Sequence, residues 1–124
     1  MSILYKEIKE LFKQVHCHKD GKITAEITFP KKFTGFKGHF PKNPVVPGVC
    51  EIMSVIVLLE LAFKQKAKLK TINLAKFLAP VTCQEKINVE LQRENKSGVL
   101  ERVKAVFMSK KRKVAEIRIE VNYE

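Results

Sequence analysis

Acidic residues are scarce in this chain of 124 residues, which has 13 Asp and Glu against 24 Lys and Arg and a formal net charge of +11. An excess of this size indicates an acidic partner without saying which one. Nucleic acid is one candidate, but the lysines are spread along the chain, and we find no aromatic–basic motif or recognition-helix pattern. The densest basic run, residues 110–113, lies between two strand-like segments and is interpreted as a solvated hairpin turn. We therefore do not predict a nucleic-acid partner.

Cysteines are few and isolated. Cys17, Cys50 and Cys83 are odd in number and lack the paired spacing of a zinc site or a disulfide framework, which fits a reducing compartment. His16 and His18 flank Cys17, but in an extended segment only the two histidines would share a face. Neither a metal nor another cofactor is predicted.

Long hydrophobic runs are also missing. The first fifteen residues are charged throughout and have no apolar signal-peptide core. The apolar run at residues 52–63 is too short to span a bilayer and contains Glu60. The expectation is a cytoplasmic protein without membrane association. Because repeats and linkers are absent as well, we predict a single domain over residues 1–124.

Hydrophobic periodicity predicts the elements of this domain. Apolar residues at helical spacing predict a helix over residues 3–15, and strict alternation predicts a strand over residues 23–29 after a strand at residues 16–18 and an Asp-Gly turn. A helix over residues 49–66 is apolar on nearly every face, which predicts that it is buried. Four strands are predicted after it, at residues 71–81, 86–93, 99–108 and 114–123.

One buried helix followed by successive antiparallel strands implies an α+β fold in which a curved sheet wraps around the helix. The exposed edge of such a sheet needs cover, and homodimerisation by edge pairing is a common solution. We therefore expect a homodimer, or a higher oligomer built from dimers.

The most specific motif is the segment 38–49, Gly-His-Phe-Pro-Lys-Asn-Pro-Val-Val-Pro-Gly-Val. Its three prolines hold the backbone extended, so His39 is presented on a stiff loop directly before the long helix. Pro47 suits the first helical position, and Gly48 keeps side-chain bulk away from the free amides of the first turn. A general base beside a helix start that can receive charge on a carbonyl oxygen predicts chemistry next to a thioester or similar carbonyl.

The same segment resembles the signature of the β-hydroxyacyl-acyl carrier protein dehydratases of the hotdog fold. Residues 75–81 and 113–119 are similar to two further segments of that family, in the same order. The resemblance implies the hotdog fold, an acyl carrier protein as the acidic partner, active sites between two protomers and no cofactor. It implies catalysis by His39, an oxyanion site at Gly48 and Val49, and an acyl tunnel lined by Phe40, Met53 and Val57.

The chain departs from that family at the acid. The family places an acidic residue five positions after the glycine of its Pro-Gly pair, where this chain has Met53, and often a glutamine four positions later, where it has Val57. Glu51 lies roughly 200° around the helix from Met53, and Glu60 lies about 10 Å along it, so neither is expected to replace the acid. Glu51 is interpreted instead as a first-turn carboxylate that complements the helix dipole, and Glu60 as a solvated or paired residue.

These residues leave several functions open. The first is a dehydratase of fatty acid biosynthesis that converts 3-hydroxyacyl thioesters on an acyl carrier protein into trans-2-enoyl thioesters and water. The second is a non-catalytic or weakly catalytic acyl-thioester-binding partner subunit, which would complete a hetero-oligomer with an acid-bearing relative. The third is an isomerase or thioesterase that uses His39 alone. Cys50 is interpreted as a small buried helix residue, the alternative being a nucleophile with a lowered thiol pKa beside His39.

Overall fold

The computed structural model describes residues 3–37, 44–97 and 100–124. The elements in chain order are the helix α1 (Ile3–Leu11), the strands β1 (Lys13–Cys17) and β2 (Ile23–Thr28), the short 3-10 helix η1 (Thr34–Phe36), the central helix α2 (Gly48–Phe63), and the strands β3 (Ala67–Phe77), β4 (Lys86–Ser97), β5 (Leu100–Ser109) and β6 (Arg112–Tyr123).

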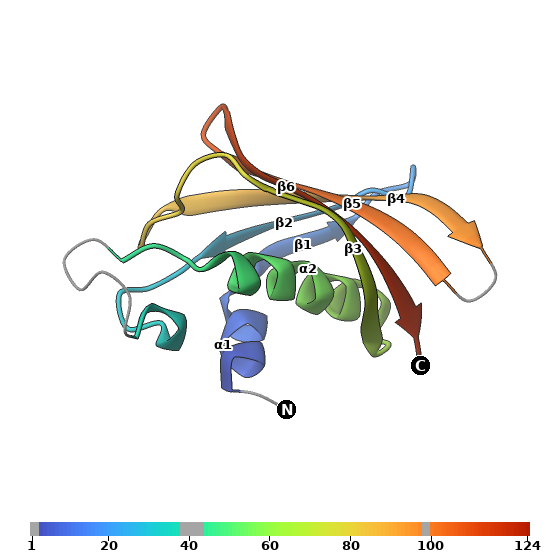
Figure 1. The fold of residues 1–124 in the computed structure, drawn as a ribbon, viewed down its shortest axis with the longest axis horizontal. Coiled ribbons are helices and arrows are strands. Elements are labelled where there is room, and N and C mark those ends of the chain that lie inside the picture. Colours follow the sequence, from blue (N-terminus) through green and yellow to red (C-terminus); the bar gives the residue numbers. More distant parts are fainter. Residues whose placement is uncertain (1–2, 38–43, 98–99) are drawn as a thin grey trace.

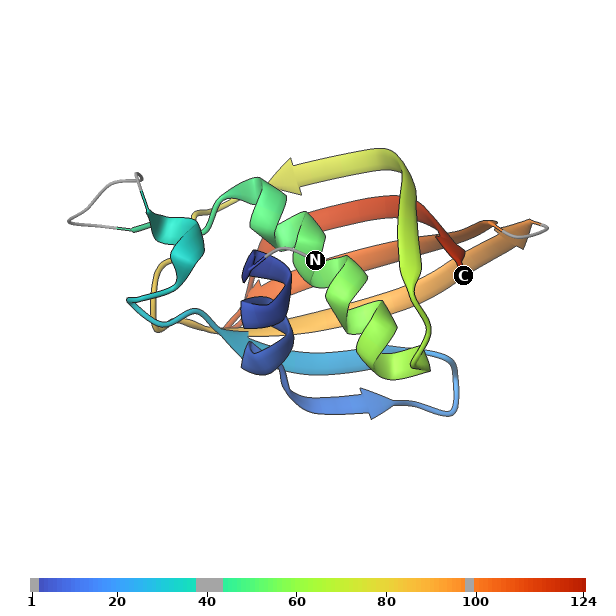
Figure 2. The same cartoon turned by 90° about the horizontal axis from the view of Figure 1, so that it is seen from below.

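The six strands form one antiparallel sheet in the order β1-β2-β4-β5-β6-β3. The sheet curves around α2, which lies along its concave side with α1 packed against it (Figures 1 and 2). β1 and β3 are the two edge strands of the sheet. β3 is the first strand after α2 and pairs with β6, the last strand of the chain. The predicted α+β arrangement, a curved antiparallel sheet wrapped around a long helix, is confirmed.

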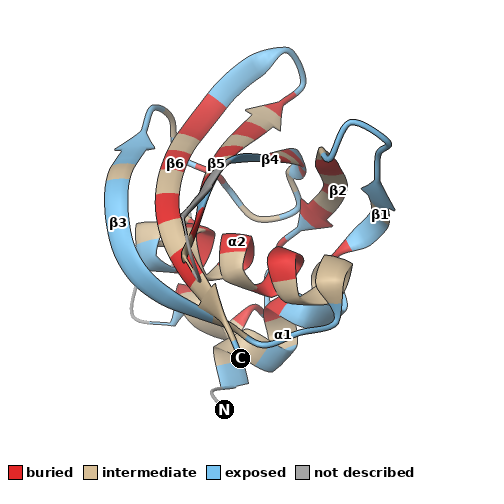
Figure 3. Cartoon of the chain, turned by 90° about the vertical axis from the view of Figure 1, so that its right-hand side faces the viewer, coloured by how far each residue is buried: buried red, intermediate tan, exposed pale blue. Residues whose placement is uncertain are grey.

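Buried and more exposed residues alternate along the strands, and the buried ones form the core. Residues 102 to 108 of β5 alternate between partly or fully exposed even positions and buried odd positions, and β2, β4 and β6 show the same pattern. Figure 3 shows buried bands on these strands and on the face of α2 turned toward them, whereas β3 is exposed over most of its length. The core of the sheet is made by buried residues of four strands: Ile23, Ala25, Ile27, Ile87, Val89, Leu91, Val103, Ala105, Phe107, Ile117, Ile119 and Val121.

Two helix predictions need correction. The first helix ends at Leu11, and Val15 belongs to β1 rather than to the helix. The central helix ends at Phe63 because Lys64 adopts a left-handed conformation with φ 55° and its N–H caps the carbonyl of Glu60. That helix is also not buried all round, since the side chain of Val49 is 62% exposed.

The strand after α2 runs four residues earlier than predicted, over Ala67–Phe77 instead of residues 71–81. Its end is set by a bend in which the N–H groups of Leu78 and Ala79 both donate to the carbonyl of Val114. Pro80 follows and has no N–H to continue the ladder. The basic run does form the β5–β6 turn, with Lys110 at φ 56°. None of the helices in the described part of the chain is long and apolar enough to cross a membrane.

Candidate active site at the start of the central helix

Among the described residues, no backbone carbonyl accepts from the amides of Gly48 and Val49 at the start of α2. Pro47 is predicted at the first helical position, but it is the N-cap, with extended backbone angles (φ −62°, ψ 145°), and the helix begins one residue later at Gly48. The N–H groups of Cys50 and Glu51 donate to the Pro47 carbonyl at 2.9 and 3.3 Å. The amides of Gly48 and Val49 precede these first helical hydrogen bonds, which places them where a helix start can bind an anionic oxygen.

Gly48 is covered by an aromatic ring from the edge strand. A Cβ at this position would lie 2.7 Å from Cζ and 2.8 Å from Cε2 of Phe77, distances that real side-chain contacts do not show. Residue 48 is therefore kept free of a side chain by the close approach of Phe77, and not only by the needs of the first turn. The ring itself is 47% exposed.

The two site residues predicted at the centre of the loop, His39 and Phe40, lie outside the described residues, as do all of residues 38–43. The flanking residues are held firmly. On one side, the Thr34 N–H donates to Glu7 Oε2 at 3.1 Å, which ties η1 to α1. On the other, the Val46 N–H donates to the Val81 carbonyl at 2.8 Å, and Val45 forms an isolated antiparallel bridge with Thr82.

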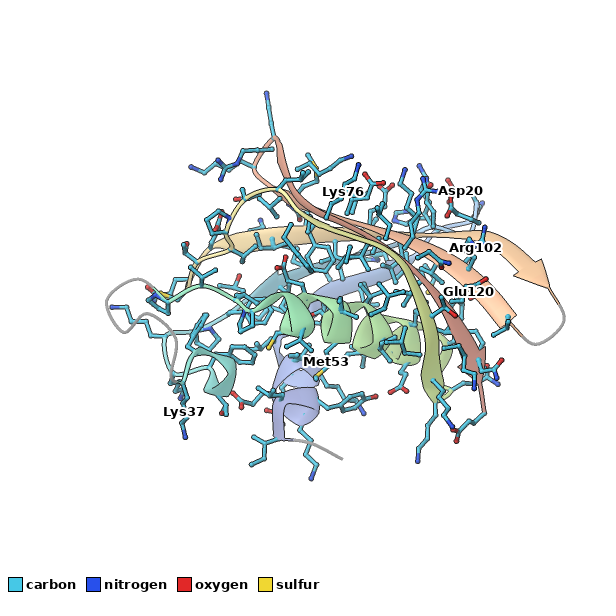
Figure 4. The ribbon with its side chains drawn as sticks, in the orientation of Figure 1. Asp20, Lys37, Met53, Lys76, Arg102 and Glu120 are labelled. Atoms are coloured by element: carbon cyan, nitrogen blue, oxygen red, sulfur yellow. The ribbon has the colours of Figure 1, made fainter. Side chains whose placement is uncertain are left out.

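The two helix residues predicted to line a tunnel differ in burial. Val57 is completely buried within the core. Met53 is half-buried against that core, and its side chain lies on the side of α2 away from the sheet, beside α1 (Figure 4). Both surroundings are apolar. The tunnel role of these residues stays a prediction.

Glu51 corrects a sequence interpretation. Instead of a first-turn carboxylate at the surface, it is 4% exposed, and burial raises its pKa to about 8. It is therefore largely protonated at neutral pH and does not complement the helix dipole as an anion. Its Oε1 has no hydrogen-bond partner in the described structure, and the same is true of Glu7 Oε1. No pattern in the sequence distinguishes such a buried glutamate from a solvated one.

The described surroundings of Cys50 do not favour its alternative role as a nucleophile. Burial, with Glu51 and Glu7 nearby, raises the pKa of its thiol, whereas a nucleophile would need a lowered one. Cys50 is 1% exposed, as expected of a small buried helix residue. Glu60 is paired, as expected, because its Oε2 accepts the Ala67 N–H at 2.6 Å.

His16 lies on β1 and His18 directly after it, and within the described residues neither joins a group of metal ligands. The rings of His16 and His18 lie 6.4 Å apart, and His18 Nε2 is 2.8 Å from Thr24 Oγ1. Within the three described segments, no group of three or more His, Cys, Asp or Glu side chains is arranged to hold a metal ion.

A buried ionic network at the opposite end of α2 was not predicted. Glu101, only 1% exposed, accepts from Arg93 Nε at 2.7 Å and from the Tyr123 hydroxyl at 2.7 Å. The Arg93 guanidinium lies 4.5 Å from the centre of the Phe63 ring, and Phe63 meets Tyr123 edge-on. Burial and the hydrogen bond to Glu101 raise the pKa of Tyr123. This network joins β4, β5 and β6 to the last residue of the helix.

A protein-family model described as ApeI dehydratase, of the ApeI-like family, matches residues 15–117, which include the His39 loop, α2 and most of the sheet. The chain belongs to the ApeI-like family. A comparison with curated proteins found no match.

Solved structures show that this ApeI-like chain has the hotdog fold. It is similar to the dehydratase heterocomplex ApeI:P from Xenorhabdus doucetiae, with a TM-score of 0.73 and 16% identity over 90% of this chain and 96% of that one. The E. coli PaaI protein from the phenylacetic acid degradation operon gives a TM-score of 0.70 and 11% identity over 96% and 86% of the two chains. The smu.793 protein from Streptococcus mutans, bound to acetyl CoA, gives 0.68 and 9% over 91% and 88%.

Family membership and the solved structures confirm the predicted hotdog fold and a dehydratase-like protein. They support a hotdog protein of the dehydratase or thioesterase kind, and the narrower resemblance to the β-hydroxyacyl-acyl carrier protein dehydratases stays a prediction. The individual site residues are not tested by these comparisons.

Proposed function

We propose that this chain is a dehydratase acting on 3-hydroxyacyl thioesters carried by an acyl carrier protein, in fatty acid biosynthesis or a similar acyl-chain pathway. The observation that supports it most is the open start of α2, directly after the His39 loop, in a chain of the ApeI-like dehydratase family. A general base that closely precedes this helix start in the chain fits proton removal next to a thioester carbonyl.

In the proposed reaction His39 removes a proton from the carbon next to the thioester carbonyl. The amides of Gly48 and Val49 stabilise the negative charge that develops on the carbonyl oxygen. The electron pair of the broken C–H bond forms the new C=C bond, the C–O bond to the hydroxyl breaks, and the hydroxyl leaves with a second proton as water. Phe40, Met53 and Val57 would line the site of the acyl chain.

The second proton needs a donor other than residue 53. The thioether of Met53 cannot supply it, and Glu51 is turned roughly 200° away around α2 and is buried. We place the donor either in a water molecule near Met53 or in a second hotdog domain that faces this end of α2. Loss of a positioned general acid costs about 10²- to 10⁴-fold in rate, so the chain on its own is expected to turn over slowly.

Charge supports the choice of carrier. Lys31 and Lys32 are exposed in the segment before η1, and Lys37 is exposed where the described part of the loop ends (Figure 4). Together they give the approach to the His39 loop a positive charge, which favours an acidic carrier protein.

A non-catalytic acyl-thioester-binding subunit is the second candidate. Met53 at the acid position is the observation that favours it, because the site would then keep substrate binding and lose the reaction.

The experiment is interconversion of 3-hydroxyacyl and trans-2-enoyl thioesters on an acyl carrier protein, with the native chain, His39→Ala and Met53→Glu. The dehydratase proposal predicts slow native turnover that is lost in His39→Ala and rises in Met53→Glu. His18→Ala, which removes an exposed histidine elsewhere, should change nothing. Native turnover that persists in His39→Ala would contradict the proposal, and activity found only in Met53→Glu would favour the binding subunit.

A further inference from the structure

The carboxylate of Glu85 joins two parts of the chain at the end of the sheet where α2 begins (Figure 1). Glu85 lies in the connection between β3 and β4. Its Oε1 accepts from the Thr82 N–H at 3.0 Å and from the Thr82 hydroxyl at 3.2 Å. Its Oε2 accepts from the hydroxyl of Ser109, the last residue of β5. One side chain therefore closes the turn at residues 82–85 and fastens that turn to β5.

Glu85 makes these contacts as an anion. Burial by itself would raise its pKa, but the hydrogen bonds from Ser109 and Thr82, with the Arg112 guanidinium nearby, outweigh burial and lower the pKa. A charged carboxylate holds such hydrogen bonds more strongly than a neutral acceptor does. Ser109 is only 6% exposed, so water has little access to its side of the contact.

The turn that Glu85 closes also holds the chain that leads into α2. The Val46 N–H donates to the Val81 carbonyl at 2.8 Å, and Val45 forms its isolated antiparallel bridge with Thr82. Thr82 therefore lies between the Glu85 carboxylate on one side and the entry to α2 on the other.

The path from this bridge to the proposed oxyanion site is short and stiff. Pro47, with φ −62°, is the one residue between Val46 and Gly48, and its ring fixes that angle. The Val46 side chain is 2% exposed, so it is held in the core as well. A shift of the bridge should therefore move the amides of Gly48 and Val49 with it.

The backbone of the turn depends on being held from outside. Gln84 has a left-handed backbone with φ 63°, which residues other than glycine rarely adopt. Such a conformation persists where the surrounding structure holds it. The Gln84 N–H donates to the Phe29 carbonyl at 2.7 Å, and Glu85 holds the turn from its other side. Without the Glu85 carboxylate we expect the turn to relax and Thr82 to shift, while Phe29 keeps the connection attached to the sheet.

We propose that Glu85 is a positioning residue, which holds the start of α2 in place through the turn at residues 82–85 without touching the substrate. The proposal rests on the proposed function, which assigns the amides of Gly48 and Val49 to the carbonyl oxygen of the thioester. A misplacement of about 1 Å can cost about 10²-fold in rate. Binding of the acyl chain and of its carrier is made elsewhere, so loss of Glu85 should lower kcat and leave KM near its native value.

Steady-state dehydration of a 3-hydroxyacyl thioester on an acyl carrier protein would compare the native chain with Glu85→Ala, Glu85→Gln and Ser109→Ala. In Glu85→Ala we expect kcat to fall at least about tenfold while KM changes by less than about threefold. Glutamine can still accept from the Thr82 N–H and donate to the Ser109 hydroxyl, so Glu85→Gln should restore kcat to within about threefold of the native value. Ser109→Ala removes one of the two attachments and should give an intermediate kcat.

Two further variants serve as controls. Glu26→Ala removes a carboxylate paired at 3.0 Å with Lys86, the residue after Glu85, and should leave kcat unchanged. In Glu85→Ala the change Ser109→Ala should have little further effect, because the two side chains act through the same contact. Circular dichroism would verify that each variant is folded.

The backbone amide signals of Gly48 and Val49 provide a result that needs no turnover. In proton–nitrogen correlation NMR spectra of the isotope-labelled chain, both signals should shift in Glu85→Ala and stay in place in Glu26→Ala. In Glu85→Gln they should return toward their native positions. A residue that only stabilises the fold would lower the free energy of unfolding without moving these two signals.

A folded Glu85→Ala variant with native kcat, or with both amide signals in their native positions, would overturn the proposal. So would a loss of activity that appears in KM alone. If Glu85→Ala does not fold, the same outcomes are decided with Ser109→Ala. No turnover in the native chain, with both signals shifted as expected, would refute the dehydratase function and leave the positioning of α2. Turnover that is lost in His39→Ala and unchanged in Glu85→Ala would refute the positioning role and leave the function.

Discussion

The ring of Phe77 lies directly over the Cα of Gly48, so close that a Cβ at residue 48 would be 2.7 Å from the ring. This contact joins the first residue of the central helix to the last residue of the edge strand. The proposed oxyanion site therefore borders the edge strand of the sheet, and a change on one side should be felt on the other.

Gly48→Ala should separate stability from function. The introduced methyl must push the Phe77 ring aside, but the ring is half exposed and can move, and alanine is the better helix former by about 1 kcal/mol. We expect the free energy of unfolding to change by no more than about 1 kcal/mol while the rate of thioester turnover falls at least about tenfold. Urea unfolding and turnover would be measured together. Turnover equal to the native rate would show that the contact has no part in the site.

Replacing Phe77 as well tests whether displacement of its ring causes the effects of Gly48→Ala. The double variant Gly48→Ala/Phe77→Ala has no ring to displace, so the effects of the two changes should not add. If the effects of the two single changes on turnover and on the free energy of unfolding simply add, the role given to the contact between Gly48 and Phe77 is contradicted.

Glu51 predicts a pH dependence of stability. Burial raises its pKa to about 8 in the folded chain, whereas the unfolded chain loses this proton near its ordinary value of about 4.3. Between these values the folded state binds more protons, so its stability is fully present below the lower pKa and falls as the pH rises toward 8. The slope from one group cannot exceed about 1.4 kcal/mol per pH unit.

Urea unfolding of the native chain and Glu51→Gln between pH 5 and pH 8, about the range of the shift, would test this. Glutamine stays neutral, so the variant should lose that part of the slope. Glu26→Gln, which alters a partly exposed residue paired with Lys86, should keep it. Parallel curves for the native chain and Glu51→Gln would contradict the burial of a protonated carboxyl.

Glu101 should be the most sensitive charged residue for stability. Glu101→Gln keeps its shape but removes the charge that Arg93 and the Tyr123 hydroxyl share, and we expect a loss of about 2–3 kcal/mol in the free energy of unfolding. Glu120→Gln breaks the more exposed pair with Arg102, 3.3 Å apart, and should cost less than about 1 kcal/mol. Equal losses in the two variants would show that the buried network is no stronger than a surface pair.

The sequence predicts the fold well because its strands alternate and its central helix has a clear start. Alternation decides which face of a strand is buried, and Pro47 and Gly48 decide where α2 begins. The end of α2 depends on the left-handed backbone of Lys64, and the end of β3 on a bend at Leu78, neither of which periodicity reports.

The site is predicted less completely for a different reason. The spacing of residues along α2 gives their relative directions but not which direction faces the sheet, α1 or a partner. The burial of Glu51 and the exposure of Val49 follow from that orientation, so both became known only from the tertiary arrangement. The lysines along β3 are visible in the sequence, but that β3 is an edge strand is known only from the order of the strands in the sheet.

The account depends most on His39 as the base, and exchange of the proton it removes is the most direct measurement. A 3-hydroxyacyl thioester on an acyl carrier protein would be incubated in D₂O with the native chain, and deuterium at the carbon next to the carbonyl followed by mass spectrometry. This step needs the base and the oxyanion site but not the missing acid. We predict incorporation with the native chain and with His18→Ala, and none above background with His39→Ala. No incorporation with the native chain, or equal incorporation with His39→Ala, would contradict the account.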